Sequence, residues 1–307
     1  MARLKIKGLI NLNGKIVPIH KAMISVMDHG FLYGDSVYDT FRTFSGYPLQ
    51  LSEHIHRLFR SATKLELKSP LSHKEIETHI FQTLLAYWKR FKKEDVYIRV
   101  ILSRGVGDIG FDVHLCPCPT FIIIVKDIPR LSQKYYEKGI SVALVSTLRN
   151  HPKSLDPNIK SGNYLNNLLA YLDAKKQKAQ DAVMKNYKGE MTEATTSNIF
   201  IVKKGVLYTP SLKSGLLKGL IRTLLIDMAR KNHLKCVEKK ITQQELLKAD
   251  ECFLCGSIKC ILPVTRCNHK KIGNGKPGPV TQKLMALFPN AVRKCIQEEY
   301  CIESSFF

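Results

Sequence analysis

The chain has 307 residues, of which 44% are hydrophobic, enough for one large domain or two medium-sized ones with separate cores. Its longest apolar runs, such as residues 121–125, are far shorter than the roughly 20 residues of a membrane-spanning helix. The first ten residues lack the apolar stretch of a signal peptide. Nine cysteines without the spacing of a small disulfide scaffold indicate reduced thiols and a cytoplasmic protein.

The charge is strongly basic, since 48 Lys and Arg face 26 Asp and Glu, a net charge of +22. Such a surplus favours nucleic acid or acidic metabolites as partners. The basic residues form no single long run, and no nucleic-acid-binding motif accompanies them. We therefore interpret the excess as spread over solvated faces, and a basic nucleic-acid-binding protein is the less favoured alternative.

The first part of the chain predicts a mixed α+β domain. Asn13-Gly14 and Ser45-Gly46 each separate alternating apolar residues, which indicates tight hairpin turns. Helical spacing of apolar residues predicts one helix over 55–65. A capping box of Ser72 with Glu75 starts the next, which runs to about residue 91. The predicted strands lie at 10–19, 37–51, 96–103 and 120–128.

After a polar stretch at 129–139 the pattern begins again. The predicted strands of this part are 140–147, 181–186, 198–210 and 251–257, and its predicted helices are 162–178, 219–232, 242–250 and 279–289. On the helix over 162–178 we expect Leu165, Leu168, Leu169 and Leu172 to form the apolar side. The pattern predicts a small N-terminal domain over 1–127, a connector over 128–136, and a large C-terminal domain over 137–307.

Lys160 stands out from the other lysines by its setting. A loop containing Pro157 leads to it, and Ser161-Gly162 and a predicted helix follow. An amine at such a turn can form a Schiff base with an aldehyde if desolvation or neighbouring cations keep it unprotonated. The local spacing alone is a weak indication of that chemistry.

Six ordered segments carry a stronger indication. They resemble the class IV aminotransferases, the fold-type IV enzymes that use pyridoxal 5′-phosphate (PLP), and the resemblance extends over about residues 8–290. The segments are residues 28–42, 53–58, 155–167, 189–200, 215–222 and 253–266. The resemblance implies a two-domain α+β and α/β fold, with a smaller N-terminal α+β domain and a larger C-terminal domain built on a mixed, barrel-like sheet.

The resemblance also implies a role for each residue that matches the family's cofactor site. Lys160 would form the Schiff base and shuttle a proton. Glu193 would pair with the pyridine nitrogen, Tyr164 with the phenolate oxygen, and Arg57 with the phosphate. Glu193 as a solvated loop acid and Tyr164 as a half-buried helix aromatic are the plain alternatives. The remaining implied cofactor contacts are Leu217, Leu220, Ile221 and Ser257, of which Leu220 and Ile221 begin a helix suited to an anion.

The implied substrate residues lie on two strands and one turn. Tyr38, Thr40 and Arg42 alternate along one predicted strand and therefore share a face. The others are Tyr97, Arg99, Ile258 and Lys259. The glycine-rich loop over 104–112 could close over the site, reach a partner subunit's site, or simply connect two strands.

The subgroup is less sharply indicated than the family. Tyr97-Ile98-Arg99 and the loop favour branched-chain aminotransferases, and residues 104–114 lack the Arg-x-His pair of the D-amino-acid subgroup. Against this, Asp39-Thr40 replaces Glu-Gly, Ser257-Ile258-Lys259 replaces Thr-Ala-Ala, and Ile159-Lys160-Ser161 is closer to the other subgroups. Lys259 would bring a charge to a turn that meets the substrate carboxylate, unless its side chain points away.

The resulting hypothesis is a PLP-dependent aminotransferase that moves an amino group between an amino acid, preferentially a branched-chain L-amino acid, and 2-oxoglutarate. The alternatives are an aminodeoxychorismate lyase, which releases pyruvate and 4-aminobenzoate, and a D-amino-acid aminotransferase. The resemblance implies a homodimer. We expect no metal, because Cys252 and Cys255, three apart in a predicted strand, point to opposite faces, although with Cys116 and Cys118 they offer four thiols.

Overall fold

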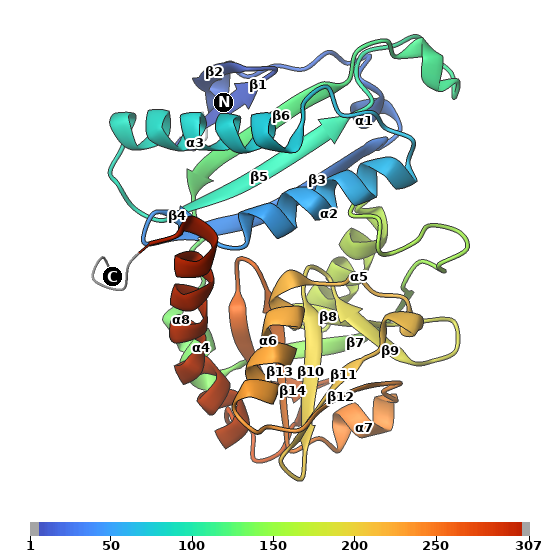
Figure 1. Ribbon diagram of the computed structural model, residues 1–307. Helices are drawn as coiled ribbons and strands as arrows, with labels where there is room; N and C mark the ends of the chain where they lie inside the picture. The colour runs from blue at the N-terminus through green and yellow to red at the C-terminus, as the bar shows by residue number, and fades with distance from the viewer. Residues whose placement is uncertain (1–5, 303–307) are drawn as a thin grey trace. The chain divides into compact units, whose positions relative to one another are not determined.

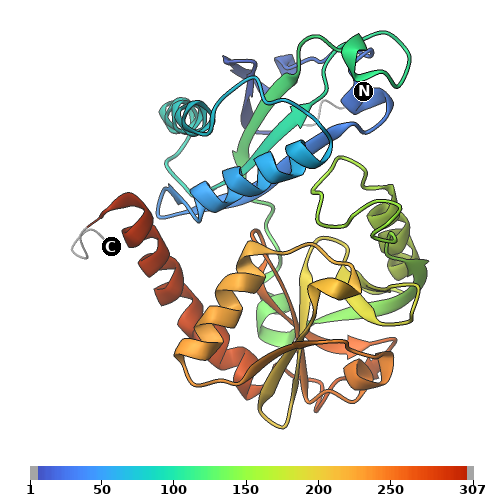
Figure 2. The same ribbon diagram turned by 45° about the vertical axis from the view of Figure 1, so that its right-hand side comes forward.

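The computed structural model describes residues 6–302, which divide into two compact units (Figure 1, Figure 2). Among these residues, the first unit contains the chain up to Pro129, Ile159–Asn163, and the chain from Lys294 onward. The second contains Arg130–Asn158 and Tyr164–Arg293. Ile159–Asn163 and the chain from Lys294 onward thus belong to the first unit, although they lie within residues 137–307, which the sequence pattern assigns to the large domain. The predicted domain limits stay predictions. No helix in the described part of the chain is long and apolar enough to cross a membrane.

The first unit is built on an antiparallel sheet of six strands in the order β2-β1-β6-β5-β3-β4. The strands are β1 (Gly8–Leu12), β2 (Lys15–Pro18), β3 (Ser36–Phe44), β4 (Tyr47–Pro48), β5 (Val96–Ser103) and β6 (Thr120–Asp127). The two predicted hairpin turns form at Asn13-Gly14 and Ser45-Gly46, where all four residues have positive φ. This is the turn whose twist matches that of the strands it joins.

Two helices, α2 (Leu51–Lys64) and α3 (His73–Arg90), cover one face of this sheet (Figure 1). Leu58 of α2 and Ile80 of α3 pack into one core with Phe41 and Ile98 of the sheet. The predicted capping box of Ser72 and Glu75 begins α3. The unit also contains α1 (His29–Leu32) and short 3₁₀ turns at Ile19–Lys21 and Val113–Leu115.

The second unit holds a mixed sheet of nine strands in the order β12-β11-β10-β13-β14-β7-β8-β9, with β15 beside β14. The pairs β11–β12, β14–β7 and β7–β8 are parallel. The sheet curls, so that β9 also approaches β10. The strands are β7 (Ile140–Leu148), β8 (Asp181–Lys185), β9 (Met191–Ala194), β10 (Asn198–Lys203), β11 (Val206–Pro210), β12 (Cys236–Lys239), β13 (Glu251–Gly256), β14 (Cys260–Cys267) and β15 (Lys270–Lys271).

The helices of this unit are α4 (Gln133–Lys138), α5 (Leu165–Lys176), α6 (Leu220–Lys231) and α7 (Gln243–Leu247), with a 3₁₀ turn at Leu212–Ser214. Helix α8 (Pro279–Tyr300) begins in this unit, and its last part, from Lys294, belongs to the first. The apolar side of α5 is not its buried side. Leu165, Leu168, Leu169 and Leu172 are all exposed, and Ala170 and Ala174 pack instead against Ala143 of β7 and Ala182 of β8. Small residues let this helix approach the sheet closely, which the leucine spacing does not reveal.

Candidate active site

The carboxylate of Asp39 on β3 pairs with polar side chains of α2. His54, Arg57 and Ser61 are all buried, and their spacing of three and four residues puts them on one side of the helix. Arg57 donates twice to Asp39, from Nε to Oδ2 at 2.7 Å and from Nη2 to Oδ1 at 2.7 Å. The Nδ1 atom of His54 lies 2.7 Å from the same Oδ1. This pairing fixes the plane of the guanidinium.

The electrostatics of this group follow from its burial. Burial by itself raises the pKa of the Asp39 carboxyl, but the charge of Arg57, together with His54, outweighs it and holds that pKa well below its usual range. Burial lowers the pKa of His54, against the raising effect of Asp39. Asp39 is therefore an anion at neutral pH, which compensates the buried charge of Arg57.

The main chain of Lys160 is fixed between α2 and β3. Its N–H donates to Ser61 Oγ at 3.2 Å, and its carbonyl accepts from the Tyr38 N–H at 2.9 Å. Ser61 in turn donates to the Arg57 carbonyl at 2.9 Å. The Lys160 amine lies 4.7 Å from the centre of the Tyr38 ring, and the guanidinium carbon of Arg99 lies 3.7 Å from it. The first unit thus gathers Lys160, Arg57, Tyr38 and Arg99.

Thr40 and Arg99 are direct partners across β3 and β5, so their side chains share a sheet face. Thr40 Oγ1 and Arg99 Nε are both buried, and neither has a hydrogen-bond partner among the described residues. Arg42 lies nearer the end of β3, where it reaches Asp95 at 3.9 Å and the Phe44 ring at 4.5 Å. The unpartnered groups at Thr40 and Arg99 can donate hydrogen bonds to an anionic or carbonyl oxygen of a ligand.

Tyr97 is the direct partner of Arg42 across the strands, and Lys126 lies 5.9 Å from the centre of its ring.

Glu193 lies on β9 in the second unit and is buried, so it is not a solvated loop acid. Arg149 Nε donates to its Oε1 at 2.9 Å. The Leu217 N–H donates to Oε2 at 3.2 Å, and Asn198 Nδ2 lies 3.4 Å from the same atom. All three donors suit the ionised form of this carboxylate.

The start of α6 approaches Asn198 closely. Asn198 Nδ2 donates to the Leu217 carbonyl at 2.9 Å, and a Cβ added at Gly219 would lie 2.0 Å from Asn198 Oδ1. A side chain at this N-cap would therefore displace the Asn198 amide, and with glycine the helix start has no side-chain cap. The first N–H groups of the helix, around Leu220 and Ile221, need partners from outside it, and an anion can supply them.

The remaining predicted residues also lie in the second unit. Tyr164 is the N-cap residue of α5. Ser257, Ile258 and Lys259 form the turn between β13 and β14. The Lys259 amine does not stay in solvent, because it donates to Asp181 Oδ2 at 2.7 Å.

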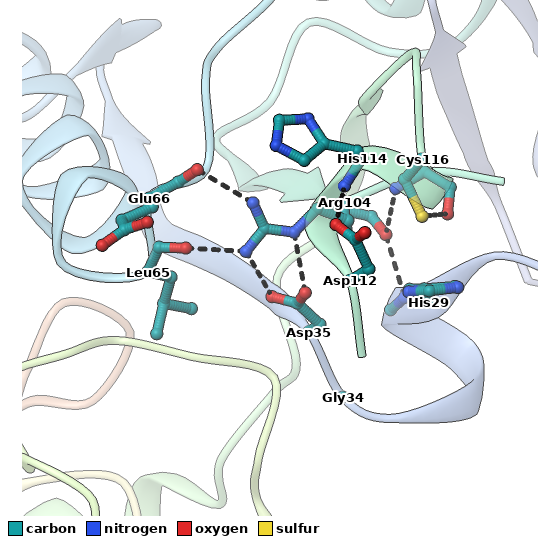
Figure 3. Close-up of polar contacts among 12 residues, drawn as sticks. His29, Gly34, Asp35, Leu65, Glu66, Arg104, Asp112, His114 and Cys116 are labelled. Carbon is teal, nitrogen blue, oxygen red and sulfur yellow. Dashed lines mark hydrogen bonds and ion pairs between the residues drawn. The ribbon is translucent and has the colours of Figure 1, made fainter. Parts of the chain in front are cut away.

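The glycine-rich loop over 104–112 is held to the chain around α1 (Figure 3). Arg104 pairs with Asp35 at 2.8 Å and donates to the carbonyls of Leu65 and Glu66 at 2.6 and 2.9 Å. His29 Nε2 lies 2.8 Å from the Asp108 carbonyl oxygen. These contacts favour a loop fixed to its own unit. Beside it is a cavity of about 260 Å³ lined by His29, Tyr33, Asp35, Leu65, Gly110, Phe111, Val113 and Asn163.

Within residues 6–302, no group of three or more His, Cys, Asp or Glu side chains could hold a metal ion. Cys252 and Cys255 are buried on β13, and Cys116 Sγ contacts the Gly105 carbonyl.

Several polar residues around Arg57 in the first unit, and around Glu193 and Lys259 in the second, have no role implied by the sequence motifs. Asp39 enters the sequence pattern only as a departure from the branched-chain subgroup, and Asn198 lies in the segment 189–200 without an implied role. Arg149 and Asp181 lie outside the six segments. Each acts through a partner that is distant in sequence or on another strand. Arg149 is one of 48 basic residues, and its sequence neighbours give no sign that it meets Glu193.

The family model described as "Amino-transferase class IV" matches residues 36–267. The chain therefore belongs to the class IV aminotransferases, a family of PLP-dependent transaminases, as the ordered segments predicted.

Two relatives and one solved structure illustrate the range of the family. The chain is 39% identical over 279 residues, 91% of its length and 94% of the relative, to a Methanocaldococcus jannaschii protein provisionally named a branched-chain-amino-acid aminotransferase. It is 32% identical to the D-alanine aminotransferase of Listeria innocua, over 94% of this chain and 98% of the relative. The branched-chain aminotransferase of Thermoproteus uzoniensis, solved with norvaline, has a TM-score of 0.86 at 29% identity and covers 93% of this chain and 95% of its own. This likeness confirms the predicted fold class.

Proposed function

We propose that this protein moves an amino group between a branched-chain L-amino acid and 2-oxoglutarate, with Lys160 as the residue that binds PLP covalently. The observation that carries the proposal is the placement of Lys160. Its main chain is fixed by Ser61 and Tyr38, and its amine lies over the Tyr38 ring. A second cation, Arg99, contacts the same ring. Neighbouring positive charge favours the neutral, nucleophilic form of an amine.

The donor set of the chain fits the cofactor. When bound, PLP supplies an aldehyde carbon, a ring that accepts electrons, and a phosphate. The phosphate requires cationic and N–H donors, and the buried Arg57, the uncapped start of α6 and the hydroxyl of Ser257 are such groups. The close approach of Asn198 to Gly219 keeps that helix start free of a side chain.

The polar residues of the second unit match the other end of the cofactor. Arg149 and the Leu217 N–H donate to Glu193 and favour its anionic form, which would hold a proton on the pyridine nitrogen of the cofactor. Tyr164 would donate its hydroxyl to the phenolate oxygen, and Leu217 would contact the ring. Lys160 would shuttle a proton between the substrate's α carbon and the C4′ carbon of the cofactor.

The substrate would meet the face of β3 and β5 that carries Tyr38, Thr40 and Arg99. The unpartnered donors of Thr40 and Arg99 suit a carboxylate, such as that of the acceptor 2-oxoglutarate. The family resemblance also implies substrate contacts for Arg42, Tyr97 and Ile258. Lys259 would not contact the substrate, because its amine is engaged by Asp181.

The proposal includes a homodimer in the cytoplasm. The exposed leucines of α5 form an apolar stripe, with exposed fractions from 46% to 66%, and Phe31, Ile109 and Phe111 are also exposed. Apolar surface of this kind is typical of an interface between copies. The nine cysteines, all free thiols, suit a reducing compartment.

The test combines a spectrum with a substrate panel. The purified full chain should absorb in the near-ultraviolet to violet, and borohydride should trap the cofactor on Lys160. Lys160→Ala should abolish both, and a band or adduct that survives would refute the assignment of this lysine. Glutamate formed from leucine and 2-oxoglutarate would support the branched-chain specificity. Glutamate formed only from D-alanine, or pyruvate released from aminodeoxychorismate, would replace it with one of the other two activities.

A further inference from the structure

The turn between β13 and β14 is short and contains Lys259, where the family resemblance implies a small residue. Gly256 pairs with Cys260, so the loop contains only Ser257, Ile258 and Lys259. Cys260 has a φ of 56°, the left-handed residue with which three-residue hairpin loops commonly close. The conformation of this loop depends on what holds its ends.

The side chain of Lys259 anchors the turn 257–259 through two polar contacts. Its amine donates to Asp181 Oδ2 at 2.7 Å and to Thr196 Oγ1 at 3.1 Å. Its carbonyl accepts from the Tyr136 hydroxyl at 3.2 Å. Both the main chain and the side chain of Lys259 are therefore tied to neighbouring elements.

Asp181 is the shared partner of two turns. Its side chain is only 4% exposed. Its Oδ1 accepts from the Thr195 hydroxyl at 2.6 Å and the Thr195 N–H at 3.3 Å, and from the Ala182 N–H at 2.9 Å. With Lys259 on Oδ2, one buried carboxylate joins the start of β8 to the turn after β9 and to the turn 257–259.

The Thr195 turn is itself anchored close to the same loop. Asn167 of α5 donates to the Thr195 carbonyl at 2.7 Å. A Cβ added at Gly256 would lie 3.3 Å from the Thr196 carbonyl oxygen, so the two turns are in near contact. Glu193 lies two residues before Thr195. The Lys259–Asp181 ion pair thus joins the segment that carries Glu193 to the segment that carries Ser257.

We propose that Lys259 and Asp181 are positioning residues, whose ion pair fixes the 257–259 turn so that Ser257 Oγ and the turn's N–H groups stay oriented toward the cofactor phosphate. This inference rests on the proposed function, since it assumes that the turn binds PLP. It accounts for a lysine at a position where the family resemblance implies a small residue. The charge of Lys259 is matched by a buried anion and does not enter the substrate pocket.

A comparison of two cofactor forms separates positioning from general stability. Pyridoxal lacks the phosphate of PLP but keeps its ring and aldehyde. Full-length protein stripped of cofactor is titrated with each, and binding is followed by the absorbance band. Lys259→Met should raise the Kd for PLP about ten-fold, the loss of roughly one charge-assisted hydrogen bond, and should leave the Kd for pyridoxal within about two-fold. Lys259→Arg should keep both near wild type.

Lys203→Met is the matched control. Lys203 pairs with Asp250 at the same distance, 2.7 Å, in the same unit, but at the other end of β10, and its loss should change neither Kd. If Lys259→Met fails to fold, Asp181→Asn tests the same pair. It removes the charge and keeps Oδ1 for Thr195 and Ala182.

Two results would overturn the inference. One is an unchanged ratio of the PLP and pyridoxal Kd values in Lys259→Met or Asp181→Asn. The other is a ratio that Lys203→Met changes equally. A wild-type protein that gains no absorbance band with PLP and no trapped adduct on Lys160 would instead refute the proposed function.

Discussion

The Asp39 carboxylate shows how much one buried side chain determines in the first unit. It is the shared acceptor of Arg57 and His54, and all three are buried. Removing one partner of a buried pair leaves an uncompensated charge, which typically costs about 3–5 kcal/mol. The stability of this unit and the orientation of Arg57, which we propose binds the phosphate, therefore both depend on Asp39.

We expect Asp39→Asn to lower the free energy of unfolding by about 3 kcal/mol, measured by urea denaturation at pH 7. The matched control is Glu94→Gln, which breaks the ion pair with Lys92 at the surface, where the side chains are 55% and 85% exposed. That control should cost less than about 1 kcal/mol. Equal losses in the two variants would mean that the buried pair stabilises the unit no more than a surface pair does.

The same carboxyl predicts how stability depends on pH. Because Arg57 and His54 hold the pKa of Asp39 below its unfolded value despite burial, the stabilisation is fully present above the unfolded pKa of about 3.9. It is lost as the pH falls from there toward the folded pKa. The unfolding free energy of the wild type should therefore decline more steeply below about pH 4 than that of Asp39→Asn, as urea titrations at a series of pH values would measure. Parallel declines would exclude Asp39 as the titrating group.

The path of the glycine-rich loop over 104–112 requires a residue without a side chain at position 105. Gly105 has a φ of 98°, and a Cβ there would lie 1.9 Å from the Cys118 carbonyl oxygen. Gly46, in the same unit, has a φ of 88°, but the nearest atom to its Cβ would be in Trp88 at 3.7 Å. The two glycines have similar φ angles and differ in the space around them.

Alanine at Gly46 should cost about 1 kcal/mol from the left-handed conformation alone. Alanine at Gly105 should cost at least about 2 kcal/mol more, because the backbone of residue 118 must move. Urea denaturation of the two variants measures the difference. Equal costs would mean that the loop adjusts freely to the added methyl group.

Elements specified by neighbouring residues were predictable from the sequence. The two hairpin turns and the capping boxes of Ser72 with Glu75 and Thr242 with Glu245 all form, because their hydrogen bonds close within four residues. The buried face of α5 was not predictable in this way. Its leucines and alanines both recur at helical spacing, and only the approach of β7 and β8 selects the alanines.

The residues of the candidate site also differ in whether the neighbouring sequence identifies them. Lys160 and Glu193 stand in ordered motifs, so the sequence points to them directly. The acceptors that organise the clusters, such as Asp39 for Arg57 and Asp181 for Lys259, are 18 and 78 residues from their partners. Such pairs depend on strand order, which a local pattern does not specify.

At the scale of the whole molecule, the leucine stripe of α5 bears on assembly. Leu168 and Leu172 are exposed within one chain, so their replacement by aspartate should not disturb folding. In a dimer that buries them, two carboxylates from each subunit would be desolvated at the interface. We expect the double variant Leu168→Asp/Leu172→Asp to sediment with half the wild-type mass at micromolar concentration.

Leu85 on α3 is the control for this experiment, since it is also exposed, at 64%, but lies in the first unit. Leu85→Asp should sediment as the wild type does. A wild type that is already monomeric, or a double variant of unchanged mass, would exclude α5 as the interface.

The return of the chain to the first unit has a consequence for the order of synthesis. Domains generally fold N-terminal first as they leave the ribosome. In this protein the beginning of β3 is completed by Lys160 and Gly162. The end of α8 then adds contacts from Glu299 to the Ser52 N–H and from the Tyr300 hydroxyl to the Pro48 carbonyl. The unit that is translated first is therefore finished last, and until then its nascent form exposes an unpaired strand edge.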